Sequence, residues 1–172
     1  MKVLTVFLFI SLIFTLFSCN SNNTDSDQNS YLGKASELLP WISSDAMREA
    51  KMENHPYVFF VDTTHEFSYG FKAKVKDLKN KSAKKITVSC DGYLYQVPSK
   101  VQLVIDIKND GNNIFWQSQS FDKNIKEAST WGNVQLSVDL PKEINSNTEI
   151  LVYVWSPSHE VGLFDNLKVK FE

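Results

Sequence analysis

Phe67-Ser68-Tyr69-Gly70-Phe71-Lys72-Ala73-Lys74-Val75 is the stretch that decides the fold. Its odd positions are apolar, and its even positions are small or cationic. A period of two predicts a β-strand with one face on a core and the other in water, whereas a helix would scatter the aromatic rings around its circumference. A dry face of this length needs a second sheet to cover it. The stretch therefore predicts one layer of a two-sheet sandwich.

The rest of the chain supplies further strands at regular, turn-punctuated spacing. They are expected at residues 57–62, 86–91 with 93–95 extending past Gly92, 101–107, 114–121, 134–140, 149–155 and 161–171. Asn109-Asp110-Gly111-Asn112 is a strong hairpin signal. Residues 149–155 are apolar at both alternating sets of positions, which favours a central strand. The pattern predicts an all-β fold, a two-sheet antiparallel β-sandwich for which eight strands suit a jelly roll.

The amino end has the layout of an export signal. Lys2 gives a cationic start, residues 3–17 are almost wholly apolar, and Ser18 precedes Cys19. Leu16-Phe17-Ser18-Cys19 resembles the lipobox of bacterial lipoproteins. The resemblance implies that residues 1–18 are removed, that Cys19 carries fatty acyl chains such as palmitate, and that the chain is anchored in the cell envelope, in the outer membrane. The alternative is a secreted protein with a free thiol near its start.

A polar tether and one domain are expected after this signal. Residues 20–30 contain no apolar side chain and are predicted to be disordered, so that residues 19–30 form a tether spanning roughly 20 Å. The sandwich domain is assigned to residues 31–172. Its first part, to about residue 54, is predicted to be irregular or to hold a short helix over 44–51 capped by Ser44.

The last third of the chain resembles galactose-binding-like jelly rolls related to carbohydrate-binding modules. The matching features are Trp131 opening a strand, Leu140-Pro141 ending it, the apolar run 150–155 and the closing run 164–169. The resemblance implies the sandwich fold and binding of a glycan or another envelope component. It also implies a structural calcium at Asp165, whereas the residue itself equally suits a turn aspartate that bonds backbone amides.

Exposed aromatic side chains are the candidate ligand contacts, because the C–H face of a sugar ring is apolar. Trp116 lies in a stretch with large groups on both faces, and Tyr93 and Tyr95 beside Gly92 are interpreted as loop aromatics flanked by polar residues. These three are the predicted ligand-binding residues. Trp131 and Trp155 are interpreted as core residues.

Seven lysines form a predicted basic patch against one acidic residue, Asp77. They are Lys72, Lys74, Lys76, Lys79, Lys81, Lys84 and Lys85. The patch suits an acidic polysaccharide or a phosphorylated lipid headgroup, and it equally suits a solvated surface that blunts aggregation. The formal charge of the whole chain is −2, which gives no general attraction to nucleic acid.

No catalytic motif stands out. Cys90 alternates in phase with Ile86 and Val88 and is predicted to be a core residue. The three histidines lack zinc-ligand spacing, and no cofactor is expected. Two hypotheses follow: a non-catalytic, membrane-anchored lipoprotein that binds glycan or another envelope component, and a structural or protein-interaction module of a surface complex without a sugar site.

Overall fold

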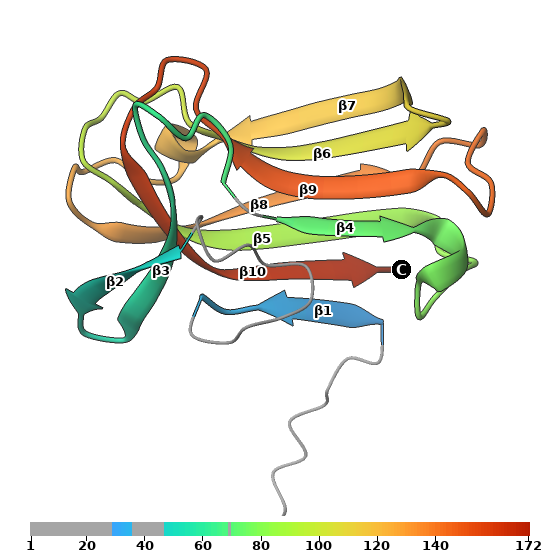
Figure 1. Cartoon of the computed structure of the whole chain (residues 1–172), viewed down its shortest axis with the longest axis horizontal. Coiled ribbons are helices and arrows are strands. Elements are labelled where there is room, and N and C mark those ends of the chain that lie inside the picture. The colour runs from blue at the N-terminus through green and yellow to red at the C-terminus, as the bar shows by residue number, and fades with distance from the viewer. Residues whose placement is uncertain (1–28, 36–46, 69) are drawn as a thin grey trace, which may run out of the picture.

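A computed structural model describes residues 29–35, 47–68 and 70–172. These residues form ten strands in two antiparallel sheets that pack face to face (Figure 1). The predicted all-β sandwich is confirmed. The predicted signal peptide, Cys19 and the helix cap Ser44 lie outside the described residues.

The larger sheet has six strands around β10. Its order is β2-β3-β10-β5-β8, and β1 pairs with the same edge of β10 as β3 does. The strands are β1 (Ser30–Gly33), β2 (Met47–Met52), β3 (His55–Val61), β5 (Lys85–Leu94), β8 (Trp131–Asp139) and β10 (Gly162–Phe171).

The smaller sheet has four strands in the order β4-β9-β6-β7. The strands are β4 (Phe71–Lys74), β6 (Gln102–Asn109), β7 (Asn112–Ser120) and β9 (Glu149–Trp155), and short 3-10 turns η2 (Val75–Asp77) and η3 (Phe121–Lys123) follow β4 and β7. β9 has a partner on each side, so the predicted central strand is confirmed. In the β6–β7 hairpin, Asp110 and Gly111 have positive φ angles of 48° and 81°, as the predicted turn requires.

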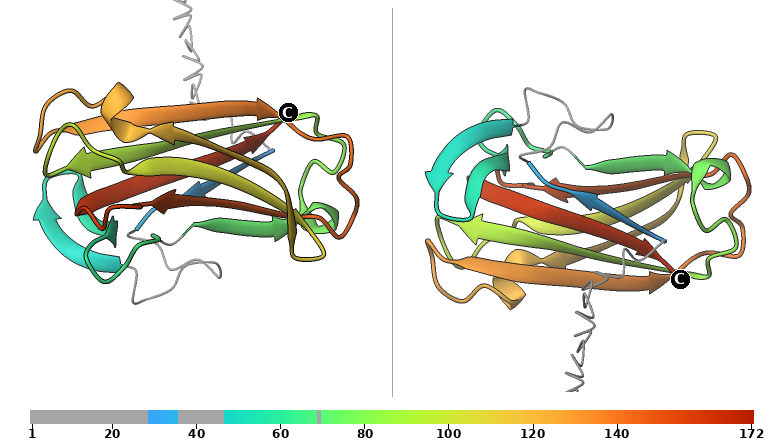
Figure 2. Two further views of the ribbon diagram at one scale, coloured as in Figure 1. Left: turned by 90° about the horizontal axis from the view of Figure 1, so that it is seen from above. Right: turned by 90° about the horizontal axis from the view of Figure 1, so that it is seen from below.

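The core lies between the two sheets, and Figure 2 shows the strands of the sandwich from above and from below. Alternate residues of each strand enter it, for example Ile86, Val88 and Cys90 on β5 and Ile150, Val152 and Val154 on β9. Cys90 is 1% exposed, which confirms its predicted core position. No described helix is long and apolar enough to cross a membrane.

The predicted amino-terminal helix is wrong for residues 47–51, which belong to strand β2. β2 pairs with β3 along the edge of the larger sheet, and this pairing overrides the modest helix preference of Met, Glu, Ala and Lys. The tether boundary also moves, because Ser30 already pairs with Lys170 as the first residue of β1.

The opening stretch does not keep one face on the core throughout. Phe67 pairs with Trp155 and Phe71 pairs with Val152. The segment from Phe67 to Phe71 therefore contains one more residue than the part of β9 between Val152 and Trp155. One extra residue reverses the faces to which the following side chains point. As a result Phe71 is 3% exposed while Phe67 is 53% exposed, so the predicted core position of Phe67 is wrong.

β10 contains a second shift of the same kind. Its register against β5 changes between Asp165 and Lys168, and Asn166 has a positive φ of 52°. Phe164 faces the main core before the shift, and Leu167 and Val169 face it afterwards. The set of alternate positions that faces the core therefore changes at Asp165-Asn166, while the chain stays in the sheet.

Candidate ligand-binding surface

Four aromatic rings gather on the outer face of the smaller sheet, and we call them the aromatic platform: Phe67, Trp116, Tyr153 and Trp155. The Phe67 and Trp155 rings lie 7° from parallel with centroids 6.4 Å apart. Trp116 meets Trp155 edge-on at 5.9 Å, and Phe67 meets Tyr153 edge-on at 5.7 Å. Phe67 and Trp116 are 53% and 44% exposed. The platform offers apolar ring surface to solvent.

Strand alternation explains why these rings share a face. Tyr153 and Trp155 are separated by the buried Val154 on β9, so both point away from the core. Trp116 on β7 pairs with Asp106 on β6, which in turn pairs with Leu151 on β9. Side chains in register across a sheet lie on the same face.

Hydrogen bonds hold the Phe67 end of the platform in place. The Trp155 Nε1 donates to Glu66 Oε1 at 2.9 Å. The backbone amide of Ser68 donates to the Val154 carbonyl, and that of Ser156 donates to the Glu66 carbonyl. The ring positions are therefore set before any ligand arrives, which lowers the entropy lost on binding.

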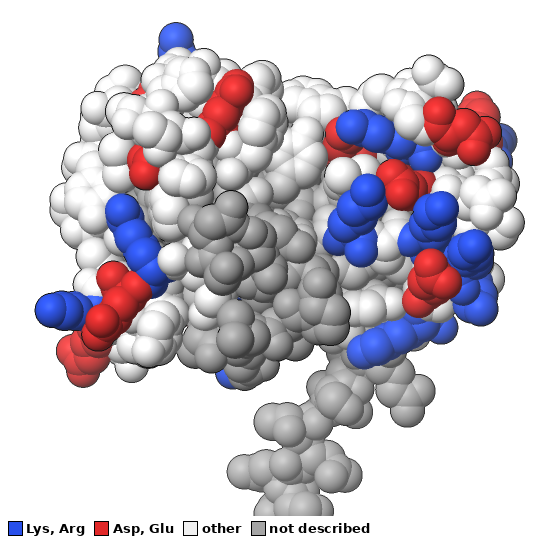
Figure 3. All heavy atoms as spheres, viewed as in Figure 1, with Lys and Arg blue, Asp and Glu red and all other residues white. Residues whose placement is uncertain are grey.

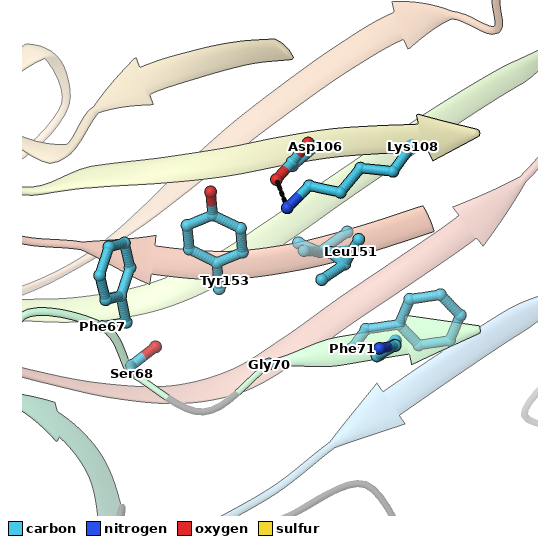
Figure 4. Close-up of a pocket in the computed structure, with 10 residues that line it drawn as sticks. Phe67, Ser68, Gly70, Phe71, Asp106, Lys108, Leu151 and Tyr153 are labelled. Carbon is cyan, nitrogen blue, oxygen red and sulfur yellow. Dashed lines mark ion pairs between the residues drawn. The ribbon is translucent and has the colours of Figure 1, made fainter. Parts of the chain in front are cut away.

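A hollow of about 420 Å³ adjoins the platform (Figure 4). Phe67, Leu151 and Tyr153 supply apolar wall, and Asp106, Lys108 and Lys72 supply polar groups. In Figure 4 the Tyr153 ring stands between Phe67 and the Asp106–Lys108 pair. The volume is within the range of small-ligand sites.

The polar groups beside the hollow are paired and locally close to neutral. The Lys108 ammonium lies 3.1 Å from Asp106 Oδ2, and the Asn113 side-chain amide donates to Asp106 Oδ1 at 2.7 Å. Burial raises the pKa of the Tyr153 hydroxyl, and the charge of Asp106 adds to that effect. Tyr153 is therefore a neutral phenol at physiological pH, able to donate and to accept a hydrogen bond.

The structure separates the three predicted ligand residues. Trp116 belongs to the aromatic platform. Tyr93 lies on β5 in the other sheet, with its ring 5.6 Å from Trp131 and 5.2 Å from Tyr95. Tyr95 is 47% exposed. Tyr93 and Tyr95 therefore form a separate aromatic group on the larger sheet.

The interpretation of Trp131 and Trp155 as core residues is wrong. Both are only partly buried. Trp131 packs on the minor cluster of Val58, Phe60 and Leu163 outside the main core, and its ring stacks on His55 at 3.8 Å. Whether a residue occupies an inward-facing or an outward-facing position of its strand, and not the size of its ring, decides its burial.

Asp165 uses its carboxylate to hold backbone and histidine groups. Oδ1 accepts from the amides of Ala35 and Asn166 at 3.0 and 2.8 Å, and Oδ2 lies 3.0 Å from His55 Nδ1. This geometry suits the turn-aspartate interpretation, and the calcium stays a prediction. Within the described part of the chain, no group of three or more His, Cys, Asp or Glu side chains could hold a metal ion.

The predicted lysine patch extends over β4, η2, the loop after η2 and the start of β5. Lys72 and Lys74 lie on β4, where Lys72 approaches Glu149 at 3.4 Å. The remaining five lie on η2, in the loop after it and at the start of β5: Lys76, Lys79, Lys81, Lys84 and Lys85. Only Lys72 borders the hollow beside the aromatic platform.

Sequence reasoning missed Phe67, Tyr153, Trp155, Asp106 and Lys108 as site residues. One signal was available for two of them, because Tyr153 and Trp155 occupy the same set of alternating positions on β9. Large apolar residues at both sets of positions were interpreted as burial on both faces. They equally mark a strand whose outer face carries a binding surface.

No protein-family model matches this sequence, and a search of curated proteins found no match. Solved structures show the fold. The CBM22-2 xylan-binding domain of Paenibacillus barcinonensis Xyn10C is similar at 8% identity and TM-score 0.50 over 83% of this chain and 99% of that one. The C-terminal CBM6 of Zobellia galactanivorans LamC is similar at 9% identity and TM-score 0.44 over 83% and 99%.

A longer protein is also similar. The CBM22-1 and GH10 modules of Clostridium thermocellum xylanase 10B, complexed with xylohexaose, match at 12% identity and TM-score 0.47 over 84% of this chain. This chain spans only 25% of that protein. The likeness to the xylan-binding domain, at TM-score 0.50, shows a β-sandwich fold shared with that carbohydrate-binding module. An identity of 8% carries the fold and not the ligand.

Proposed function

We propose that this protein is a non-catalytic, membrane-anchored lipoprotein that binds a glycan on the outer face of its smaller sheet. The observation that carries the proposal is the aromatic platform beside a hollow with paired polar groups. Exposed rings offer a flat apolar surface for the C–H face of a sugar, and Asp106, Asn113 and Lys108 offer hydrogen bonds to its hydroxyl groups. The sandwich fold is compatible with this use and does not prove it.

A polysaccharide binding assay tests the glycan site. Soluble xylan, β-glucan and polygalacturonate would be titrated into the chain from Asn20 to Glu172, with tryptophan fluorescence as the readout. We expect at least one glycan to bind, and Trp116→Ala to weaken that binding at least tenfold, since a central aromatic contact contributes about 2 kcal/mol.

Tyr95→Ala is the matched control, because Tyr95 is 47% and Trp116 is 44% exposed. Tyr95 lies outside the platform, so its variant should bind as the unaltered chain does. Equal losses in the two variants, or no response to any glycan, would contradict the proposal. The second outcome would favour the protein-interaction module without a sugar site.

The anchor is proposed from the sequence of residues 1–19. Mass spectrometry of the protein isolated from its own membranes should find Cys19 as the first residue, carrying acyl chains. Cys19→Ala should abolish incorporation of radiolabelled palmitate. An unmodified Cys19 would refute the anchor and leave the glycan site untouched.

A further inference from the structure

Lys79, in the loop after η2, contacts the first residues of the described chain. The Lys79 Nζ donates to the Ser30 carbonyl at 2.9 Å, and the Lys79 amide donates to the Tyr31 hydroxyl at 2.8 Å. The Phe171 amide donates to the Asn29 carbonyl at 3.0 Å. Figure 3 shows several Lys and Arg side chains at this end of the molecule, with Asp and Glu side chains among them. We call Lys76, Lys79, Lys81, Lys84 and Lys85 the basic end.

Three of these lysines border one hollow without a carboxylate. Lys76, Lys81 and Lys84 line a space of about 340 Å³ together with Val75, Ala83 and the 144–146 loop. All three are exposed, and within the described part of the chain none of them makes an ion pair. Asp77, Glu143 and Glu172, whose backbone oxygen accepts from the Lys84 amide, do not line the hollow. Three ammonium groups that make no ion pair and border one hollow attract an anion.

The basic end and the aromatic platform lie at opposite ends of one strand. The backbone amide of Val75, on η2, donates to the Thr148 carbonyl just before β9 begins, and Trp155 ends that strand. A seven-residue strand spans about 20 Å. A contact made by the lysines therefore leaves the platform free.

We infer that the basic end docks on an anionic membrane surface, contacting lipid phosphate groups through Lys76, Lys81 and Lys84. Position favours a membrane over a glycan, because Lys79 of the basic end contacts Ser30 and Tyr31 at the start of the domain and the basic end lies away from the aromatic platform. Docking in this way turns the aromatic platform away from the bilayer. The inference goes beyond glycan binding and requires neither a glycan nor the acyl chains on Cys19.

Vesicle flotation tests the docking directly. Every described strand lies at or after Ser30, so the chain from Asn20 to Glu172 retains the whole described fold without the leader or Cys19. At low salt it should bind vesicles of equal phosphatidylglycerol and phosphatidylcholine more strongly than pure phosphatidylcholine vesicles. The combined variant Lys76→Gln, Lys81→Gln, Lys84→Gln should bind roughly 100-fold more weakly, at about fivefold per lysine near an anionic surface.

The matched control removes the same charge elsewhere. Lys100→Gln, Lys123→Gln, Lys126→Gln changes three exposed lysines on and near η3, at the far end of the smaller sheet. It should keep vesicle binding within a few-fold of the unaltered chain, and salt of about 1 M should abolish binding by all forms. Circular dichroism of each variant checks the fold.

Two results would overturn the inference. One is binding to phosphatidylglycerol vesicles no stronger than to phosphatidylcholine vesicles. The other is an equal loss in the two triple variants, which would mean that net charge alone acts. Binding to soluble polygalacturonate, lost only in the first triple variant and without vesicle binding, would make the basic end a site for acidic polysaccharide instead.

Discussion

At the residue scale, Gly70 allows the chain to pass from Phe67 on the aromatic platform to Phe71 in the core. A Cβ built on Gly70 would lie 1.8 Å from the carbonyl oxygen of Val152. That neighbour is backbone of a central strand, so it cannot move aside as a flexible side chain would. The close approach of these two backbones is what places Phe67 outside and Phe71 inside the sandwich.

We therefore expect Gly70→Ala to lower the free energy of unfolding by about 2–4 kcal/mol through steric overlap. Gly111→Ala is the comparison, because its Cβ would meet nothing within 4 Å although its φ is +81°. That variant should lose only about 1 kcal/mol, the cost of a left-handed residue. Urea denaturation measures both. A Gly70→Ala loss no larger than that of Gly111→Ala would contradict the close packing.

The hydrogen bonds of the Asp62 carboxylate predict a specific pH dependence of the stability of the fold. Its Oδ1 lies within 2.9 Å of the Thr64 hydroxyl and His65 Nδ1 and accepts from the amides of both residues at 2.8 Å. Burial acts to raise the pKa of Asp62, but these hydrogen bonds together lower it well below its ordinary value. The ionised carboxylate therefore stabilises the fold above its unfolded pKa of about 4, and this contribution is lost as the pH falls further.

Asp62→Asn should thus be less stable than the unaltered chain at pH 6, and the difference should shrink as the pH falls from about 4 towards 2. Thermal unfolding across this range measures it. Asp77→Asn is the control, because exposed Asp77 on η2 has no hydrogen-bond partner among the described side chains. A stability difference for Asp62→Asn that stays constant with pH would show that its hydrogen bonds do not depend on charge.

At the scale of elements, Asp165 joins three parts of the chain that are distant in sequence. Its carboxylate binds the amide of Ala35 after β1, His55 at the start of β3 and the amide of Asn166 inside the β10 register shift. The side chain is 8% exposed. Buried donors that lose their acceptor are costly.

Asp165→Ala should therefore cost about 2–4 kcal/mol of unfolding free energy, since it leaves several groups unsatisfied. Asp165→Asn keeps an acceptor oxygen for the two amides and should cost less. Denaturant titration compares the two with Asp110→Ala, which alters an exposed turn residue. A loss for Asp165→Ala equal to that for Asp110→Ala would mean that the carboxylate is not a structural connector.

At the scale of the whole molecule, the two proposed binding surfaces lie at different ends of the sandwich. The aromatic platform would bind through apolar contact, which salt hardly affects. The basic end would bind through charge attraction, which salt screens. Because about 20 Å of β9 separates them, both can be occupied together.

We expect the chain to carry a bound polysaccharide to anionic vesicles. A fluorescent form of the glycan found in the titration should float with phosphatidylglycerol vesicles only when the protein is present. Trp116→Ala should release the glycan and keep the protein on the vesicle, and the Lys76, Lys81, Lys84 triple variant should do the reverse. Competition between vesicles and glycan for the protein would contradict two separate ends.

The sequence by itself determined the fold class, the eight strands from β3 to β10, the hairpin at Asp110-Gly111 and the burial of Cys90. Alternation and turn chemistry are local properties of the chain, so they can be read without knowing any partner strand. The same local reasoning misassigned residues 47–51 as helical, because pairing with β3 is not visible in that segment.

Only the tertiary structure decided which side of the sandwich each aromatic ring occupies. One-residue shifts between Phe67 and Phe71 and between Asp165 and Lys168 turn the alternation over, and a shift exists only relative to the neighbouring strand. The separation of Trp116 from Tyr93 and Tyr95 follows from the division of the strands between two sheets. The separation of the basic end from the aromatic platform follows from their places at opposite ends of β9. Strand order depends on contacts between residues far apart in the chain, which no local pattern records.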